Sequence, residues 1–198
     1  MMIETHTIET KTHGRYLVRR GTNAHLLVGF HGYGESAEKH LSELEKVGVD
    51  WTLVAVQGLH RFYTRSEDVV ASWMTRQDRE LAIADNIEYV RRVVDELKPS
   101  DRLVFAGFSQ GAAMAYRAAN AILCNGLIIL GGDLPPDVAT ADVPVLIGRG
   151  TRDDWYTDEK LKKDLSFLPH AETRVFDGGH EWSDDFRAAA REFLSSLS

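Results

Sequence analysis

Three residues of this chain, Ser109, Asp153 and His180, are of the types that together activate a hydroxyl group as a nucleophile. Ser109 is the centre of Gly107-Phe108-Ser109-Gln110-Gly111, which lies between the apolar run 103–106 and an alanine-rich segment. Between a strand and a helix, the pattern Gly-x-Ser-x-Gly is typical of a nucleophile elbow, a strained turn that lifts the serine hydroxyl above a sheet. We therefore expect Ser109 to act as a nucleophile.

The residues that would activate this serine follow later in the chain. A serine hydroxyl is a poor nucleophile at neutral pH, so it needs a base, and the base needs a group that orients it. Asp153 comes after the apolar run 143–147 and a glycine-marked turn, and His180 comes after the run 173–176 and two glycines. In an open α/β sheet, sites are built beyond the carboxyl ends of parallel strands, where both residues are expected to lie. We predict Asp153 as the acid and His180 as the base, with Asp154 as an alternative acid.

A fourth segment could stabilise the negative charge that such an attack creates. His31-Gly32-Tyr33-Gly34 follows the apolar run 26–30, and its glycines allow a backbone amide to point at a developing oxyanion. The second donor would be the amide of Gln110, at the positive end of the helix that it opens. We expect His31 itself to be a structural hydrogen-bonding residue rather than the base.

The elements that must position these residues alternate between strands and helices. Short apolar runs typical of strands buried on both faces occupy residues 24–30, 51–56, 103–106, 126–130 and 143–147, and helix-like segments occupy 35–47, 79–97, 110–123, 157–168 and 183–197. This alternation predicts an α/β fold with a mainly parallel sheet and helices on both faces. Residues 15–20 alternate as an exposed antiparallel strand would, and residues 57–78 show no clear structure.

Composition narrows the class of protein. The 198 residues predict a single domain, 1–198, and 43% of them are apolar, enough for a sizeable core. A net charge of −7 without a basic cluster argues against a nucleic-acid partner, and no apolar run is long enough to span a membrane. The single Cys124 suits a reducing compartment, so we expect a cytoplasmic protein. We expect no metal or nucleotide cofactor; a homo-oligomer is compatible with the sequence.

These motifs resemble the α/β-hydrolase superfamily and, within it, the phospholipase/carboxylesterase group of small serine esterases, which includes the acyl-protein thioesterases. The resemblance covers essentially the whole chain. It implies that Ser109, Asp153 and His180 form a catalytic triad and that the amides of Tyr33 and Gln110 form the oxyanion hole. Ser72-Trp73-Met74 is similar to the pocket-lining tryptophan segment of the group. Two positions depart from its pattern: Trp73 lacks the following Phe-Asp, and Asp154-Trp155-Tyr156 stands where small or apolar residues are usual.

The resemblance and the loop lengths suggest the substrate. Only about a dozen residues separate the fourth and fifth apolar runs, too few for a helical lid, so we expect an open site. Trp73, Trp155 and Trp182 would line it, although each could instead be a loop anchor packed on the core. The expected reaction is hydrolysis of small to medium acyl or aryl esters. A thioesterase or lysophospholipase with the same triad is the alternative, followed by a binding protein without turnover.

Overall fold

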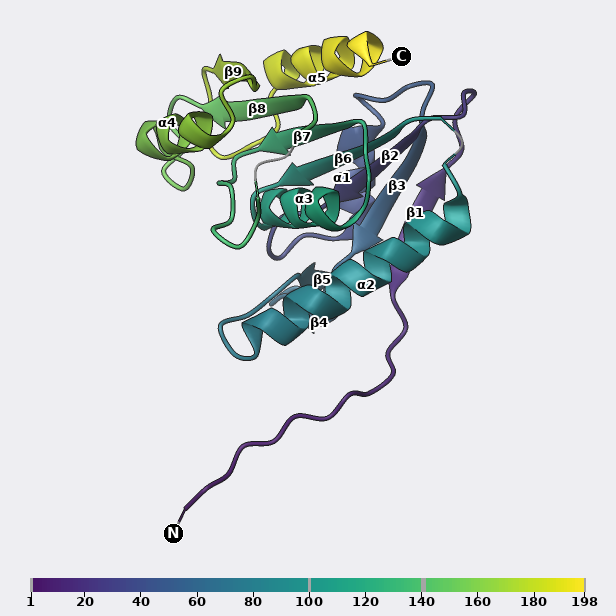
Figure 1. Cartoon of the computed structure of the whole chain (residues 1–198), viewed down its shortest axis with the longest axis vertical. Helices are drawn as coiled ribbons and strands as arrows, with labels where there is room; N and C mark the ends of the chain where they lie inside the picture. Colours follow the sequence, from purple (N-terminus) through teal and green to yellow (C-terminus); the bar gives the residue numbers. More distant parts are fainter. Residues whose placement is uncertain (1, 100, 140–141, 198) are drawn as a thin grey trace.

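The computed structural model describes residues 2–99, 101–139 and 142–197, and its centre is a seven-stranded sheet in the order β1-β3-β2-β6-β7-β8-β9 (Figure 1). The strands are β1 Arg15–Arg19, β2 Leu26–Phe30, β3 Thr52–Gln57, β6 Leu103–Phe108, β7 Gly126–Leu130, β8 Val145–Gly150 and β9 Glu172–Phe176. Strand β1 runs antiparallel to β3, and the other neighbours are parallel. Every residue of β2, β6, β7 and β8 is buried, as expected for strands covered on both faces.

Helices cover the two faces of the sheet in two groups. The helices are α1 Ala37–Leu44, α2 Arg79–Leu97, α3 Gln110–Ala121, α4 Asp158–Phe167 and α5 Asp184–Ser196. Residues of α2, α3 and α4 share one hydrophobic core with the sheet, and residues of α1 and α5 share the other. The chain therefore has the layered α/β architecture that its alternating pattern predicts, and the described residues between β7 and β8 form no lid.

The expected elements agree with the structure to within a few residues, with one correction. Residues 57–78, for which the sequence indicates no clear structure, contain an antiparallel hairpin of β4 His60–Tyr63 and β5 Val69–Ser72. Strand β4 is mostly exposed and lacks the apolar run that marks the other strands, whereas β5 is largely buried but only four residues long. The hairpin is joined to the segment after β2 by a bridge between Glu35 and Ala71, a contact between distant parts of the chain.

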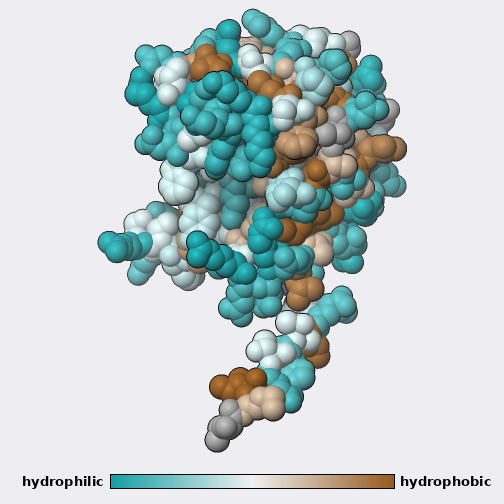
Figure 2. All heavy atoms as spheres, turned by 60° about the vertical axis from the view of Figure 1, so that its left-hand side comes forward, coloured by the Kyte–Doolittle hydropathy of each residue, from teal (hydrophilic) through white to brown (hydrophobic). Residues whose placement is uncertain are grey.

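The N-terminal residues 2–14 form neither helix nor strand and extend away from the body (Figures 1 and 2). They are exposed throughout, including Met2, Ile3 and Ile8. Hydrogen bonds to the body begin at the end of this segment: the His13 carbonyl accepts from the Arg61 guanidinium, and the Arg15 carbonyl accepts from the Tyr89 hydroxyl at 2.6 Å. Among the described residues, no helix combines the length and the apolar character needed to cross a membrane.

Candidate active site

Ser109 lies at a sharp turn between β6 and α3, with a backbone φ of 55° and ψ of −118°. This conformation is strained for a residue with a side chain. A Cβ atom at Gly111 would lie 2.0 Å from the Phe30 carbonyl oxygen, and one at Gly107 would lie 2.3 Å from the Gly111 carbonyl oxygen. Both glycines are thus required by the close approach of helix and strands. The elbow predicted from the sequence is present, and its serine is partly exposed.

Asp153 and His180 meet at the same edge of the sheet, beyond β8 and β9. The His180 Nδ1 atom lies 2.8 Å from Asp153 Oδ2, and the carboxylate side chain is 1% exposed while the imidazole is 21% exposed. The other carboxylate oxygen accepts the backbone N–H groups of Trp155 and Tyr156, at 2.8 and 2.9 Å. An ionised carboxylate accepts only, so Nδ1 carries the proton and Nε2 is left for a further partner. Asp154 is exposed, and the structure brings Asp153 to the histidine.

A glycine that sequence reasoning missed makes room for this pair. Gly131 directly follows β7 and has a φ of 62°, a conformation that favours glycine. A Cβ atom there would lie 2.9 Å from His180 Cε1 and 3.3 Å from Asp153 Oδ2. The sequence does contain a signal for it, because the Gly131-Gly132 pair directly follows an apolar run. Ser109, Asp153 and His180 also come after apolar runs.

Hydrogen bonds fix the orientation of the Gly32–Tyr33 peptide, so that the Tyr33 N–H points away from His31 Nδ1 and the Glu35 N–H. The Gly32 carbonyl oxygen lies 2.7 Å from His31 Nδ1 and also accepts the Glu35 N–H. In a trans peptide the N–H points opposite to the carbonyl. Within the described part of the chain, neither the Tyr33 N–H nor the Gln110 N–H has an acceptor, which leaves both amides available to an anion.

His31 is a structural residue. Its ring is buried, and Nε2 accepts the Gly58 N–H at 3.0 Å while Nδ1 faces the Gly32 carbonyl. Burial lowers the pKa of His31 below its ordinary value, so the ring stays neutral. The geometry agrees with the expectation that His31 orients the loop and is not the base.

Trp73 is an anchor in the core rather than a residue that a ligand reaches. Its indole is fully buried, and Nε1 donates to the His31 carbonyl at 2.8 Å. Its backbone N–H donates to Gln110 Oε1 at 2.9 Å, and its carbonyl accepts from Asn86 Nδ2 at 2.9 Å. Of the two alternatives for Trp73, burial favours the anchor. The Gln110 and Asn86 side chains, which sequence reasoning did not identify, connect this segment to the nucleophile elbow and to α2.

The other two tryptophans lie near the histidine. Trp155 is 74% exposed, and its ring centroid lies 6.5 Å from that of His180. Trp182 is half-buried and packs against Phe108 and Phe186, at centroid distances of 6.4 and 5.6 Å. Of the three tryptophans proposed for substrate contact, Trp155 is the most open to solvent.

The arrangement is suited to acyl transfer. It combines a serine on a strained turn, a histidine whose ring is oriented by a buried carboxylate, and two free backbone N–H groups at the same edge of the sheet. Among the described residues, no three or more His, Cys, Asp or Glu side chains are clustered as ligands for a metal ion.

Comparison with known proteins bears on the fold and the family of this chain. The chain resembles the crystal structures of a carboxylesterase from Bacillus cereus (18% identity, 93% of this chain and 95% of that chain, TM-score 0.74) and one from Mesorhizobium loti (18%, 92% and 94%, TM-score 0.77). It also resembles acyl-protein thioesterase 2 of Zea mays (17%, 93% and 99%, TM-score 0.76). At these identities the likeness establishes the fold, and no curated protein matches the sequence significantly. The sequence model of the phospholipase/carboxylesterase family matches residues 18–197, and the chain therefore belongs to that hydrolase family.

Proposed function

We propose that this protein is a serine carboxylesterase that cleaves small to medium acyl or aryl esters through an acyl-enzyme on Ser109. The observation that carries the proposal is the 2.8 Å contact between His180 Nδ1 and the buried Asp153 carboxylate. This contact leaves the opposite nitrogen of the histidine to act as a base. Membership of the phospholipase/carboxylesterase family and the fold shared with carboxylesterases support the same class of reaction.

In the first half of the proposed reaction, His180 Nε2 takes the proton of the Ser109 hydroxyl, and Oγ attacks the ester carbonyl carbon. The amides of Tyr33 and Gln110 donate to the resulting oxyanion. When the tetrahedral intermediate collapses, the bond to the alcohol oxygen breaks and Nε2–H protonates that oxygen. Asp153 keeps the proton on Nδ1 and stabilises the imidazolium ion while it exists.

In the second half, water replaces the alcohol. His180 removes a proton from water, the hydroxyl oxygen attacks the acyl carbon, and the same amides stabilise the second oxyanion. The acid product leaves as Ser109 recovers its proton. The chemistry needs no cofactor, and it applies equally to a thioester or a lysophospholipid.

The test is whether Ser109 is the residue that reacts, and with what. A fluorophosphonate probe should label the folded protein at Ser109, as located by mass spectrometry, and Ser109→Ala should abolish both labelling and ester hydrolysis. A panel of esters and thioesters with graded acyl length should show the highest kcat/KM with short and medium acyl esters. A folded protein without a Ser109 adduct would overturn the enzyme proposal, and a preference for thioesters or long acyl chains would favour the alternatives.

A further inference from the structure

Resting on the proposed esterase activity, we propose that Trp155 forms a subsite for the leaving group and selects planar aromatic alcohols over aliphatic ones. The acyl group would lie on the other side of the scissile bond. Trp155 lies two residues after Asp153, in the segment Asp154-Trp155-Tyr156.

The backbone of Trp155 is fixed even though its indole is 74% exposed. Its N–H donates to Asp153 Oδ1 at 2.8 Å, and its carbonyl accepts from Lys160 Nζ at 2.9 Å. The next residue, Tyr156, is fully buried, and its hydroxyl donates to Asp164 at 2.9 Å. The indole of Trp155 is therefore exposed to solvent, while hydrogen bonds fix the N–H and the carbonyl of its backbone. A ligand that covered the indole would bury apolar surface without having to order this part of the backbone.

The aromatic side chains of Phe108 and Trp155 lie close to the His180 imidazole. Phe108 has its centroid 4.9 Å away and is buried, whereas Trp155 has its centroid 6.5 Å away and is exposed. A group that approaches the histidine from solvent can therefore gain new contact area on Trp155 and little on Phe108.

The direction of proton transfer brings the leaving group to the His180 imidazole, which this indole borders. Because Nδ1 is bonded to Asp153, Nε2 must deliver the proton, and the alcohol oxygen must come within about 3 Å of it. An aryl ring on that oxygen extends a few ångströms further. Aromatic rings interact at centroid separations of roughly 4.5–7 Å. The indole, which borders the imidazole, is thus within stacking reach of an aryl alcohol.

The experiment compares two acetate esters that produce the same acetyl-enzyme. Phenyl acetate has an aromatic leaving group, and hexafluoroisopropyl acetate has an aliphatic leaving group of similar acidity. The ratio of their kcat/KM values isolates recognition of the leaving group, because the acyl group and the deacylation step are shared. We expect Trp155→Ala to lower the phenyl-to-hexafluoroisopropyl ratio about threefold to tenfold, and Trp155→Phe to retain most of it.

A matched control separates this effect from a general one. Phe167 is an exposed aromatic at the far end of α4, and Phe167→Ala should leave the ratio unchanged. Labelling of Trp155→Ala by an alkyl fluorophosphonate at the wild-type rate would show that the triad is intact. An unchanged ratio in Trp155→Ala, or an equal loss with both esters, would overturn the subsite while the esterase proposal stands. Absence of hydrolysis of either ester by the wild-type protein would overturn both.

Discussion

Two adjacent acidic residues show how strongly position determines the role of a side chain. Asp153 is buried, contacts His180 and accepts two backbone N–H groups, whereas Asp154 is exposed to solvent. Their side chains are chemically identical, so the difference comes from the turn after β8. The backbone there is held by two hydrogen bonds of 2.8 Å, from the Thr151 N–H to the Phe176 carbonyl at the end of β9 and from the Arg152 N–H to the Gly178 carbonyl in the histidine loop.

Replacing Asp153 should therefore nearly abolish ester hydrolysis, whereas replacing Asp154 should not. We expect Asp153→Asn to lower kcat for ester hydrolysis by about 10,000-fold, the effect of the corresponding change in a well-studied triad, because an amide can stabilise the wrong tautomer of the histidine. Asp154→Asn should stay within about twofold of wild type, since no role in the reaction is proposed for it. Steady-state kinetics on one ester check both variants, and a larger loss in Asp154→Asn would reassign the acid.

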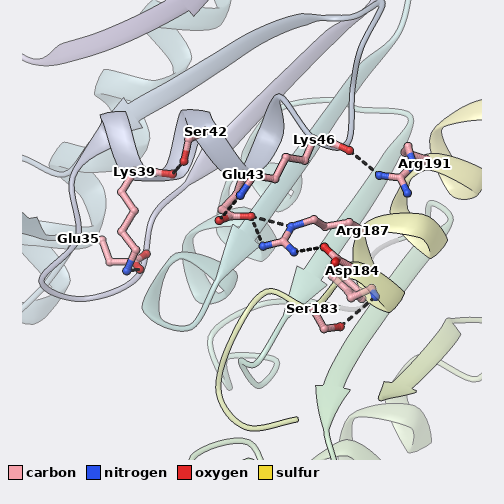
Figure 3. A network of polar contacts seen from close by, with 10 residues as sticks. Glu35, Lys39, Ser42, Glu43, Lys46, Ser183, Asp184, Arg187 and Arg191 are labelled. Atoms are coloured by element: carbon pink, nitrogen blue, oxygen red, sulfur yellow. Dashed lines mark hydrogen bonds and ion pairs between the residues drawn. The ribbon is translucent and has the colours of Figure 1, made fainter. Parts of the chain in front are cut away.

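At the scale of elements, two helices that follow site loops are joined by a charged pair. Helix α1 follows the segment His31-Gly32-Tyr33-Gly34, and α5 follows the loop that carries His180. Figure 3 shows the Arg187 guanidinium of α5 between Glu43 of α1 and Asp184. The hydrogen bonds from this guanidinium to the two carboxylates are 2.6–2.8 Å long. The Glu43 and Arg187 side chains are mostly buried, so water screens this pair less than it screens a surface pair.

The Glu43–Arg187 pair should contribute measurably to stability. Arg187→Met should lower the free energy of unfolding by about 1–3 kcal/mol, because the mostly buried Glu43 carboxylate loses both hydrogen bonds from the guanidinium and retains the one from Lys46 Nζ at 3.0 Å. The matched control is Arg92→Met, which removes an exposed pair with Glu88 within α2 and should cost less than about 1 kcal/mol. Urea denaturation at neutral pH measures both, and equal losses would show that the contact between helices adds nothing beyond a surface pair.

For the molecule as a whole, a buried histidine links folding to pH. His40 lies in α1 under the sheet, and neither of its ring nitrogens has a hydrogen-bonding partner in the described part of the chain. Burial, and to a smaller extent the neighbouring His31, lowers the pKa of His40 from 6.5 to about 3. Between these values the unfolded chain takes up a proton that the folded protein does not. Its contribution to stability is therefore complete above pH 6.5 and decreases as the pH falls toward 3.

Replacing His40 should make the unfolding free energy less dependent on pH below about 6.5. From pH 7 to pH 5, proton uptake by His40 in the unfolded chain should cost the wild-type protein about 2 kcal/mol of unfolding free energy. The unfolding free energy of His40→Leu should fall by about 2 kcal/mol less than that of the wild type between pH 7 and pH 5. Leucine does not titrate, and His31 contributes equally to both proteins. Chemical denaturation at the two pH values measures the difference, and parallel losses in the two proteins would contradict the assignment.

Much of this architecture was predictable from the amino-acid sequence. The buried apolar runs predict the parallel strands, and the bounds of α2 agree at both ends with the predicted segment 79–97. Ser183 forms the expected N-terminal cap of α5, where its hydroxyl accepts the Phe186 N–H at 3.1 Å. These features depend on periodicity and on residues a few positions apart, so a short stretch of sequence is enough to predict them.

The sequence by itself determined the α/β class, the elbow at Ser109 and the order of serine, acid and histidine along the chain. The tertiary structure decided which acid meets His180, that Trp73 is buried, that Gly131 makes room for the histidine, and that β4 and β5 pair beside residues 34–35. The physical reason is that burial on both faces of a strand imposes an apolar run within one segment. A contact between side chains 27 positions apart depends instead on how separate segments pack, and no local pattern records it.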